Sequence, residues 1–512
     1  MNTHPKTAPA IAYAALLTIH GALAAGSAPQ PTTPALESAA EPTAAAAEVK
    51  LKEPWFTWKL GDPITFLKGQ ISFDIQVRER VEWRDNWIDF SDATKVRDSF
   101  ALLQRLRLGL KYQPWPEFTA YAQLQDARTF FDRADNDATR EFISNDSPIA
   151  LRQGYLQWNR FLETPFSFKL GRQVLSYGEE RLIGGFEWDN NARTFDALRL
   201  SYQGDGFAID YFAGYVVLHR TEGFNNPDTT DLFTGVYASA GFIPEWETDL
   251  FLLWRSKSQV TPSTTFTGRD ERVDGNTAPA GDYATCGMRL KTKKEAFGPW
   301  DMNAEFAFQA GGISNPQGFG SVVAGNPINV GRQNLVAGAL HIEGGYTFAA
   351  PWKGRIYLEY NYGSGDRNPN DGTSYTFQNL FPTNHKFYGS MDRFSWQNMH
   401  NPAIGVTVVP HEKLRWKLEY HLFWLAETKD VWRFAGQQAV GGAARYGNAL
   451  NRQASSFVGS ELDLTVRYDL SKWIKLEAGY SHFFTGDYVR NTAPSGRTED
   501  ADFVYLQALT NF

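Results

Sequence analysis

The chain has 512 residues, of which 15% are aromatic and 44 are glycine, and its formal net charge is −7. This acidic balance excludes a nucleic acid as the main partner, since binding to phosphate backbones requires an excess of Lys and Arg. After the N-terminal segment, no stretch approaches the roughly 20 consecutive apolar residues of a membrane-spanning helix. An aromatic-rich chain of negative mean hydropathy is therefore either a soluble all-β protein or a membrane β-barrel.

The first 24 residues have the pattern of a secretory signal peptide. Lys6 gives a weakly basic start, an apolar run covers Ala10–Ile19, and Ala22–Ala24 fits a small-x-small cleavage site. The single cysteine, Cys286, is compatible with export, because one thiol cannot form an internal disulfide. We therefore expect residues 1–24 to be removed and the remaining chain to leave the cytoplasm.

Residues 25–63 are expected to form a flexible periplasmic tail. Their first part is rich in Ala, Pro and Thr, as in Pro29–Pro34 and Ala44–Ala47. Such a composition buries too little apolar surface to offset the entropy lost on ordering. The segment is also too short for the folded plug domain that a TonB-dependent receptor would place before its barrel.

From residue 64 onward the sequence alternates with a period of two. In residues 71–83, one face carries the apolar side chains Ile71, Phe73, Ile75, Val77, Val81 and Trp83. The other face carries Ser72, Asp74, Gln76, Arg78, Arg80 and Glu82. Successive side chains of a strand point to opposite faces, so the segment is a strand with one apolar and one charged side, and only Glu79 breaks the rule.

The same alternation recurs to the end of the chain. About 18 such segments begin near residues 71, 100, 118, 150, 166, 195, 206, 231, 247, 282, 300, 334, 353, 402, 413, 456, 473 and 501. Short connections at 113–116, 350–353 and 410–413 contrast with long ones at 127–149, 258–281, 363–400 and 427–455. A soluble β-sandwich has no reason for this asymmetry. Residues 64–512 are therefore predicted to form an all-β, transmembrane antiparallel β-barrel with long extracellular loops and short periplasmic turns.

The C-terminus supports an outer-membrane barrel of a Gram-negative bacterium. Phe512 ends the chain, and Val504, Leu506 and Ala508 precede it at alternating positions. This pattern resembles the signal by which the barrel-assembly machinery receives its substrates. We expect that machinery, outer-membrane lipid and lipopolysaccharide as partners, and a monomeric barrel.

The predicted inward faces are rich in arginine. Arg residues lie on or near the polar side of several strands, namely Arg78, Arg80, Arg105, Arg107, Arg199, Arg355, Arg415 and Arg467. A positive constriction attracts anions, and guanidinium groups bind carboxylates in bidentate fashion. The alternative is a ladder of Arg–carboxylate pairs that only stabilises the wall, for which Glu82, Glu359, Glu419 and Asp463 are available partners.

The densest charged stretch, Leu170–Arg199, resembles the alginate-export family of outer-membrane porins. It holds a Leu-Gly-Arg-Gln strand, an acidic-basic turn, Trp188-Asp189 and an Asp-Ala-Leu-Arg strand. Matching segments precede it at 105–110 and 151–158 and follow it at 365–372, 381–388, 401–402 and 414–418. The long tail before the barrel departs from the family pattern, and the resemblance covers residues 64–512.

The resemblance implies a monomeric 18-stranded barrel whose Arg-lined constriction passes a polyuronate to the cell surface, with long loops that gate the pore. The matching motifs place Arg105, Arg107, Arg152, Arg172, Asp189, Arg193 and Arg199 at that constriction. Arg355 and Arg415 from later strands, together with Arg78 and Arg80, complete the predicted substrate-binding set.

Other functional classes have weaker support in the sequence. Asp132–Asp137 and Asp366–Asp371 have oxygen ligands suited to Ca²⁺, but solvated turns explain them equally well. The nine histidines form no metal-binding motif, and no serine nucleophile is marked near His341 or His421, so no cofactor, metal or enzymatic activity is expected. The chain is thus predicted to be an anion-selective outer-membrane channel for an anionic polysaccharide or small anions. The alternatives are a general small-solute porin and a non-conducting structural or adhesin barrel.

Overall fold

The computed structural model describes residues 56–57, 64–87, 90, 98–134, 147–220, 224–258, 280–314, 332–368, 371–435, 455–492 and 498–512. All of these belong to the unit Trp55–Phe512, which is distinct from Met1–Pro54. The predicted signal peptide, the predicted tail 25–63 apart from Phe56–Thr57, and most of the acidic Asp132–Asp137 loop lie outside the described residues.

Eighteen long strands form the wall of a β-barrel within the described residues. In chain order they are β3 (Ile71–Asp85), β4 (Asp98–Trp115), β5 (Phe118–Ala134), β6 (Ser147–Trp158), β7 (Phe166–Gln173), β8 (Phe195–Gln203), β9 (Phe207–Leu218), β10 (Asn226–Ala240), β11 (Trp246–Lys257), β12 (Gly281–Thr292), β13 (Trp300–Ser314), β14 (Arg332–Thr347), β15 (Arg355–Gly363), β17 (Met399–His411), β18 (Leu414–Trp424), β19 (Phe457–Asp469), β20 (Ile474–Thr485) and β21 (Ala501–Asn511). Apart from β10, which begins five residues before the predicted position, each strand begins within three residues of its prediction.

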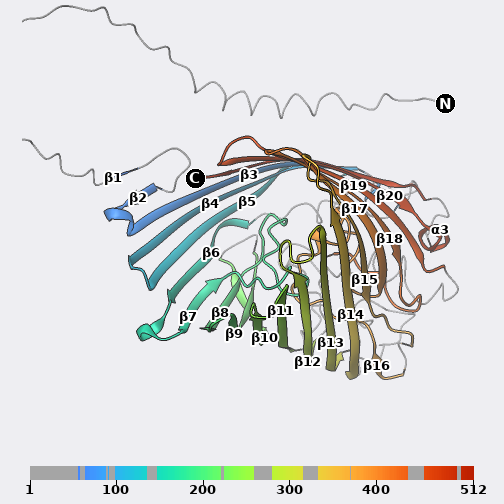
Figure 1. The fold of residues 1–512 in the computed structure, drawn as a ribbon. Coiled ribbons are helices and arrows are strands. Elements are labelled where there is room, and N and C mark those ends of the chain that lie inside the picture. Colours follow the sequence, from blue (N-terminus) through green and yellow to red (C-terminus); the bar gives the residue numbers. More distant parts are fainter. Residues whose placement is uncertain are drawn as a thin grey trace, which may run out of the picture. The chain divides into compact units, whose positions relative to one another are not determined.

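Each wall strand pairs antiparallel with the next, and the last strand pairs with the first. β21 lies against β3, with Leu509 opposite Arg78 and Gln507 opposite Arg80. Phe512 extends this seam, because its N–H donates to Ile75 O (2.8 Å) and its own carbonyl accepts from Ile75 N (3.1 Å). The predicted closed barrel of 18 strands is therefore confirmed, and closure removes the exposed edges of an open sheet (Figure 1).

The wall places apolar side chains outside and charged side chains inside. On β4, Leu106 and Leu108 are 46% and 45% exposed, whereas the alternating Arg105 and Arg107 are 3% and 5% exposed. A soluble protein would bury the leucines instead, so the outer surface is suited to lipid. The exception in the predicted pattern, Glu79, accepts a hydrogen bond from Gln104 Nε2 (2.7 Å) on the neighbouring strand.

Shorter elements complete the described chain. β1 (Phe56–Thr57) pairs with β2 (Ile64–Phe66), and β2 pairs with β3. Phe56–Thr57 falls within the predicted tail 25–63, and its backbone pairs with β2. The remaining elements are β16 (Thr373–Ser374), α3 (Asp487–Thr492) and the 3-10 turns η2 (Leu67–Gly69), η3 (Phe161–Glu163) and η5 (Asn384–Lys386).

Among the described residues, no helix is both long enough and apolar enough to cross a membrane.

Two long connections fold back into the barrel interior. We call residues 174–194, between β7 and β8, lumen loop 1, and the described residues 364–368 and 371–398, between β15 and β17, lumen loop 2. Phe381 of lumen loop 2 packs against Phe195 and Phe233 on the inner face of β8 and β10, with ring centroids 5.1 and 4.9 Å apart. An apolar core therefore lies inside the barrel, between these loops and the wall. Residues 363–400 were expected as a long extracellular loop, and the described part of this loop enters the barrel because its aromatic side chains are buried there.

Candidate functional site

Five predicted arginines meet on one side of the lumen. Strand alternation directs Arg78 and Arg80 of β3 and Arg105 and Arg107 of β4 to the same face, and Arg78 lies directly opposite Arg105 in the register. Arg152 of β6 joins them. All five side chains are buried, and together we call them the arginine cluster.

Most of the arginine cluster holds the backbone of lumen loop 1. Arg78 Nη1 donates to Glu187 O (2.7 Å), and Arg105 Nη1 donates to the same oxygen (3.1 Å). Arg80 Nη1 donates to Trp188 O (2.8 Å), and its guanidinium lies 3.7 Å from the centre of the Trp188 ring. These charge-assisted bonds fix residues 187–189 against the wall.

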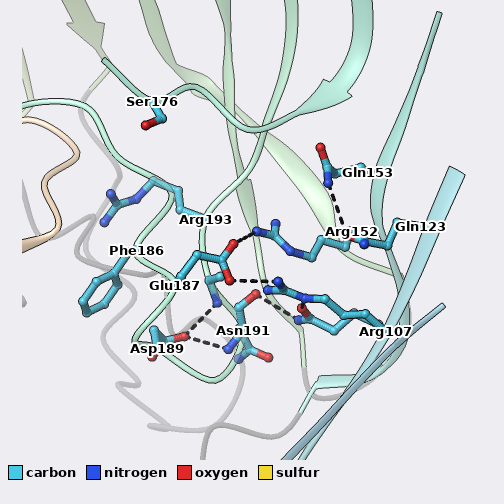
Figure 2. Close-up of polar contacts among 12 residues, drawn as sticks. Arg107, Gln123, Arg152, Gln153, Ser176, Phe186, Glu187, Asp189, Asn191 and Arg193 are labelled. Atoms are coloured by element: carbon cyan, nitrogen blue, oxygen red, sulfur yellow. Dashed lines mark hydrogen bonds and ion pairs between the residues drawn. The ribbon is translucent and has the colours of Figure 1, made fainter. Parts of the chain in front are cut away.

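The Glu187 side chain lies among the remaining guanidinium donors, as Figure 2 shows for Arg107 and Arg152. Its Oε2 lies 2.8 Å from Arg107 Nη1 and 3.3 Å from Arg105 Nη2, and its Oε1 contacts Arg152 Nη2. The Glu187 side chain is 52% exposed, although the three arginines are 3–5% exposed. Glu187 therefore lies between the arginine cluster and the open lumen.

The arginine cluster also governs the ionisation of Glu187. The surrounding barrel partly desolvates this carboxyl group, which alone would raise its pKa, but the guanidiniums of Arg152 and Arg107 outweigh that effect and hold the pKa below its ordinary value. Glu187 is consequently ionised throughout the physiological range.

The cluster keeps more positive charge and more donors than its nearby carboxylates use. Glu82 pairs with Arg80 (2.7 Å), and the Asp189 carboxylate accepts from the backbone N–H groups of Asn191 (2.8 Å) and Ala192 (3.1 Å). Arg107 Nη2 and the Nε and Nη1 atoms of Arg152 are buried without a hydrogen-bond acceptor among the described residues. Buried guanidinium donors normally find acceptors, so this region is suited to an additional anion.

Arg193 joins the two lumen loops rather than facing the pore. Its Nη1 donates to Gly184 O (3.0 Å) in lumen loop 1 and to Pro382 O (2.9 Å) in lumen loop 2. Beside it, Gly184 N donates to Phe381 O (2.8 Å). Arg193 is 3% exposed and therefore fixes the path of both loops through the lumen.

The other four predicted arginines are separate from the cluster and pair with wall carboxylates. These pairs are Arg172 Nε with Asp196 (2.7 Å), Arg199 Nε with Asp210 (3.8 Å), Arg355 Nε with Asp301 (2.8 Å) and Arg415 Nη1 with Asp469 (3.0 Å). They have the geometry of the Arg–carboxylate ladder that the sequence left open. Arg415 is half exposed near a short turn of the wall.

Two important lumen residues were not singled out from the sequence. Glu187 lies in the charged stretch Leu170–Arg199, from which the predicted set contains only Arg172, Asp189, Arg193 and Arg199. Arg181 of lumen loop 1 is buried, with Nη2 2.9 Å from His341 Nε2 and 3.4 Å from Glu359 Oε1. The acidic-basic run at 179–181 was the signal for such a residue, but its partners are far away in the sequence.

One group in the described residues has the donor set of a cation site. Ligand atoms of His341, Glu343 and Glu359 lie within 4.8 Å of one another. Arg181 already pairs with Glu359 (3.4 Å), and Arg355 pairs with Glu343 (2.5 Å). A cation there would have to compete with two guanidiniums, so the group is better described as part of an ion-pair network.

Comparison with known proteins identifies the family. The family profile described as "Alginate export" matches residues 69–501. No curated protein sequence matches the chain. Solved structures of similar fold include OccK1 (OpdK) of Pseudomonas aeruginosa, with 12% identity, a TM-score of 0.52, and coverage of 86% of this chain and 98% of that chain.

Two further solved structures have the same fold. OccK9 (OpdG) of Pseudomonas aeruginosa has 11% identity, a TM-score of 0.56, and coverage of 88% of this chain and 99% of that chain. OccAB3 of Acinetobacter baumannii has 11% identity, a TM-score of 0.55, and coverage of 86% and 99%. At these identities the structures show a shared barrel fold, while the family match covers most of the chain. The chain belongs to the alginate export family and is an outer-membrane β-barrel of the porin type.

Proposed function

We propose that this protein is a passive, anion-selective channel that conducts an anionic polysaccharide of the alginate-like, polyuronate class and carries out no chemistry. The observation that carries the proposal is the arginine cluster, whose buried guanidinium donors exceed the acceptors around them. Every sugar unit of a polyuronate bears a carboxylate, which is the group that guanidinium binds best.

The position of the cluster in a closed barrel strengthens its effect on anions. Charges inside a low-dielectric wall act over longer distances than charges on an open surface, because less water screens them. Binding must nevertheless be weak enough for the solute to leave again. The arginine cluster, in which some guanidinium donors have no acceptor, is better suited to both attracting and releasing the solute than a single tight site would be.

We also propose that the barrel works as a monomer in outer-membrane lipid and lipopolysaccharide, and that the assembly machinery recognises the strand that ends at Phe512. The alternating apolar side chains of β21 support this proposal, since such a terminal strand is an amphipathic assembly signal.

A second candidate function is the passage of small organic carboxylates. It is favoured by the two lumen loops, whose buried aromatic side chains fill part of the interior. One protein of similar fold, OpdK of Pseudomonas aeruginosa, has been crystallised with vanillate, which is a small carboxylate. A narrow lumen with the same guanidinium chemistry would be suited to such solutes.

The test is single-channel recording of the refolded barrel in a planar bilayer, with reversal potentials in a KCl gradient and added oligomannuronate. We expect anion selectivity and a concentration-dependent block. Arg152→Gln should weaken the block about tenfold, which corresponds to about 1.4 kcal/mol for one charge-assisted hydrogen bond. Arg467→Gln removes the same charge from an ion pair with Glu477 (2.7 Å) elsewhere on the wall, and should change the block much less.

The other outcomes distinguish the candidates. Permeation of vanillate without any block by oligomannuronate would favour the small-carboxylate channel. A correctly folded barrel that is silent or cation-selective would contradict both candidates.

A further inference from the structure

We propose that Glu187 is a built-in competitor for the substrate: its carboxylate occupies the guanidinium site that a uronate carboxylate enters, and the substrate must displace it to bind. This inference rests on the proposed function, because it assumes that carboxylates pass the arginine cluster. It makes lumen loop 1 a determinant of affinity in addition to the wall.

The first argument is chemical identity. A glutamate side chain and a uronate unit present the same group, a carboxylate with two acceptor oxygens. Glu187 engages Arg107 at 2.8 Å and contacts Arg152 (Figure 2), and it also lies 3.3 Å from Arg105. Three guanidiniums from β4 and β6 thus converge on one carboxylate, as they would on a bound anion.

The second argument is access. The three arginines are walled in, whereas the Glu187 side chain is 52% exposed to the lumen. An anion in the pore therefore meets Glu187 before it meets the guanidiniums. The donors without acceptors, Arg107 Nη2 and Arg152 Nη1 and Nε, adjoin those that hold Glu187. A carboxylate that displaces Glu187 therefore finds additional donors next to the ones it takes over.

The third argument is that lumen loop 1 does not depend on the Glu187 side chain for its position. The backbone carbonyl of Glu187 is held by Arg78 (2.7 Å), and that of Trp188 by Arg80 (2.8 Å). Arg193 anchors the same loop at Gly184 O (3.0 Å). The carboxylate can therefore swing away from the cluster while the loop backbone stays where it is.

A tethered competitor also explains how such a basic cluster can conduct. Several buried guanidiniums without a counter-ion would hold an anionic polymer too tightly for release. A carboxylate that returns to the site whenever a sugar unit leaves lowers the affinity and favours onward movement.

The opposing interpretation is that Glu187 is a strut that keeps Arg105, Arg107 and Arg152 in place. The two interpretations predict opposite signs for Glu187→Gln, which removes the charge and nearly preserves the shape. A competitor, once neutralised, leaves the site free and tightens binding. A strut, once neutralised, lets the arginines move and weakens binding.

The experiment measures the half-blocking concentration and the dwell time of oligomannuronate on single channels of the full-length refolded barrel. For Glu187→Gln we expect the half-blocking concentration to fall at least about tenfold and the dwell time to lengthen. The reason is that the side chain at position 187 no longer competes, as a carboxylate, with the substrate for a charge-assisted hydrogen bond. Glu179→Gln is the matched control. It makes the same change in the same loop, but Glu179 pairs with Lys291 (2.7 Å) rather than with the cluster.

Each outcome is decisive. If oligomannuronate blocks the wild type, but Glu187→Gln is blocked equally or more weakly, or no more tightly than Glu179→Gln, the inference is overturned and the proposed function stands. If the wild type is not blocked and Glu187→Gln becomes blocked, the competitor is supported in its strongest form. If neither channel is blocked, both the inference and the polyuronate function fail.

Discussion

One of the links between the two lumen loops depends on a single side chain. Arg193 Nη1 donates to Gly184 O (3.0 Å) and Pro382 O (2.9 Å), and the guanidinium is buried. The substitution Arg193→Met preserves much of the side-chain volume but removes both donors. It leaves the hydrogen-bonded ladder of the wall untouched, so the barrel should still close and fold.

The size of the effect follows from the bond to Pro382 O, because the bond to Gly184 O lies within lumen loop 1. A hydrogen bond to a charged group contributes about 1.5–3 kcal/mol. Because 1.4 kcal/mol corresponds to a factor of ten, the ratio of separated to joined loops should rise by roughly ten- to a hundredfold. Backbone bonds between the loops remain, among them Gly184 N to Phe381 O (2.8 Å) and Phe381 N to Leu182 O (2.8 Å), so the loops should separate transiently rather than permanently.

Single-channel recording reports this equilibrium directly. We expect steady current from the wild type and, from Arg193→Met, additional noise with excursions to a larger conductance. Arg193→Lys should be intermediate, since an ammonium group is a point donor without the planar fork. Arg467→Met, which breaks a wall pair between the exposed Arg467 and Glu477, is the control. Equal current noise in the wild type and in Arg193→Met would refute the role of Arg193 in joining the two lumen loops.

Three further predictions address pH, the wall and assembly. Burial, reinforced by Asp430, raises the pKa of Asp366 in lumen loop 2 from 3.8 to about 6. The folded loop therefore binds more protons than the unfolded chain between these values, and its stability should fall by on the order of 2 kcal/mol as the pH rises through them. Asp366→Asn should abolish that pH dependence in amide exchange of residues 364–398, and an unchanged profile would contradict it. Gly171 has φ +119°, and a Cβ there would overlap Gly154 O. Gly171→Ala should therefore lower the free energy of unfolding of the barrel by about 1–3 kcal/mol, which is measured as a lower urea midpoint. An unchanged midpoint would speak against this strain. Phe512→Ala keeps both backbone hydrogen bonds of residue 512. It should therefore slow insertion into liposomes by the assembly machinery, while spontaneous folding keeps its rate. Equal slowing of both processes would mean that the Phe512 ring stabilises the barrel wall and does not act as a recognition signal.

The wall could be predicted from the sequence because its rule is local. A lipid-facing surface forces every second side chain to be apolar, so strand positions follow from the pattern alone. The inward direction of Arg78, Arg80, Arg105 and Arg107 follows from the same alternation and is confirmed by their burial. The structure also explains why the Leu-Gly-Arg-Gln motif has glycine at position 171, because the backbone there adopts a conformation that other residues rarely adopt.

The path of the lumen loops could not be predicted in this way, because it depends on contacts between distant segments. Lumen loop 1 meets lumen loop 2 through a bridge between Ile183 and Phe381, almost two hundred positions apart. The sequence of neither segment predicts that it contacts the other. One signal was present: Phe377, Phe394 and Trp396 make residues 363–400 unusually apolar for an extracellular loop, and all three are fully buried.

The arginine cluster divides into two parts with different roles, and substitutions should separate them. Arg78 directs its donors to the carbonyls of Glu187, Trp188 and Asp189, so it positions lumen loop 1. Arg152 contacts the loop through the Glu187 carboxylate and keeps two nitrogen atoms without acceptors. Arg78→Gln should therefore increase current noise, because it frees the loop backbone, and should alter oligomannuronate block only as a consequence.

Arg152→Gln should instead weaken the block at unchanged noise, because the loop backbone keeps its anchors at Arg78 and Arg193. The two variants remove the same charge from the same wall, so their difference reports geometry rather than net charge. If both changed noise and block in the same proportion, the cluster would act as a single diffuse positive field. The separate arrangement of loop-holding and anion-facing donors would then have no functional meaning. If the two effects separate, selectivity in this channel depends on the few guanidinium donors that lumen loop 1 leaves available, rather than on the total number of arginines in the wall.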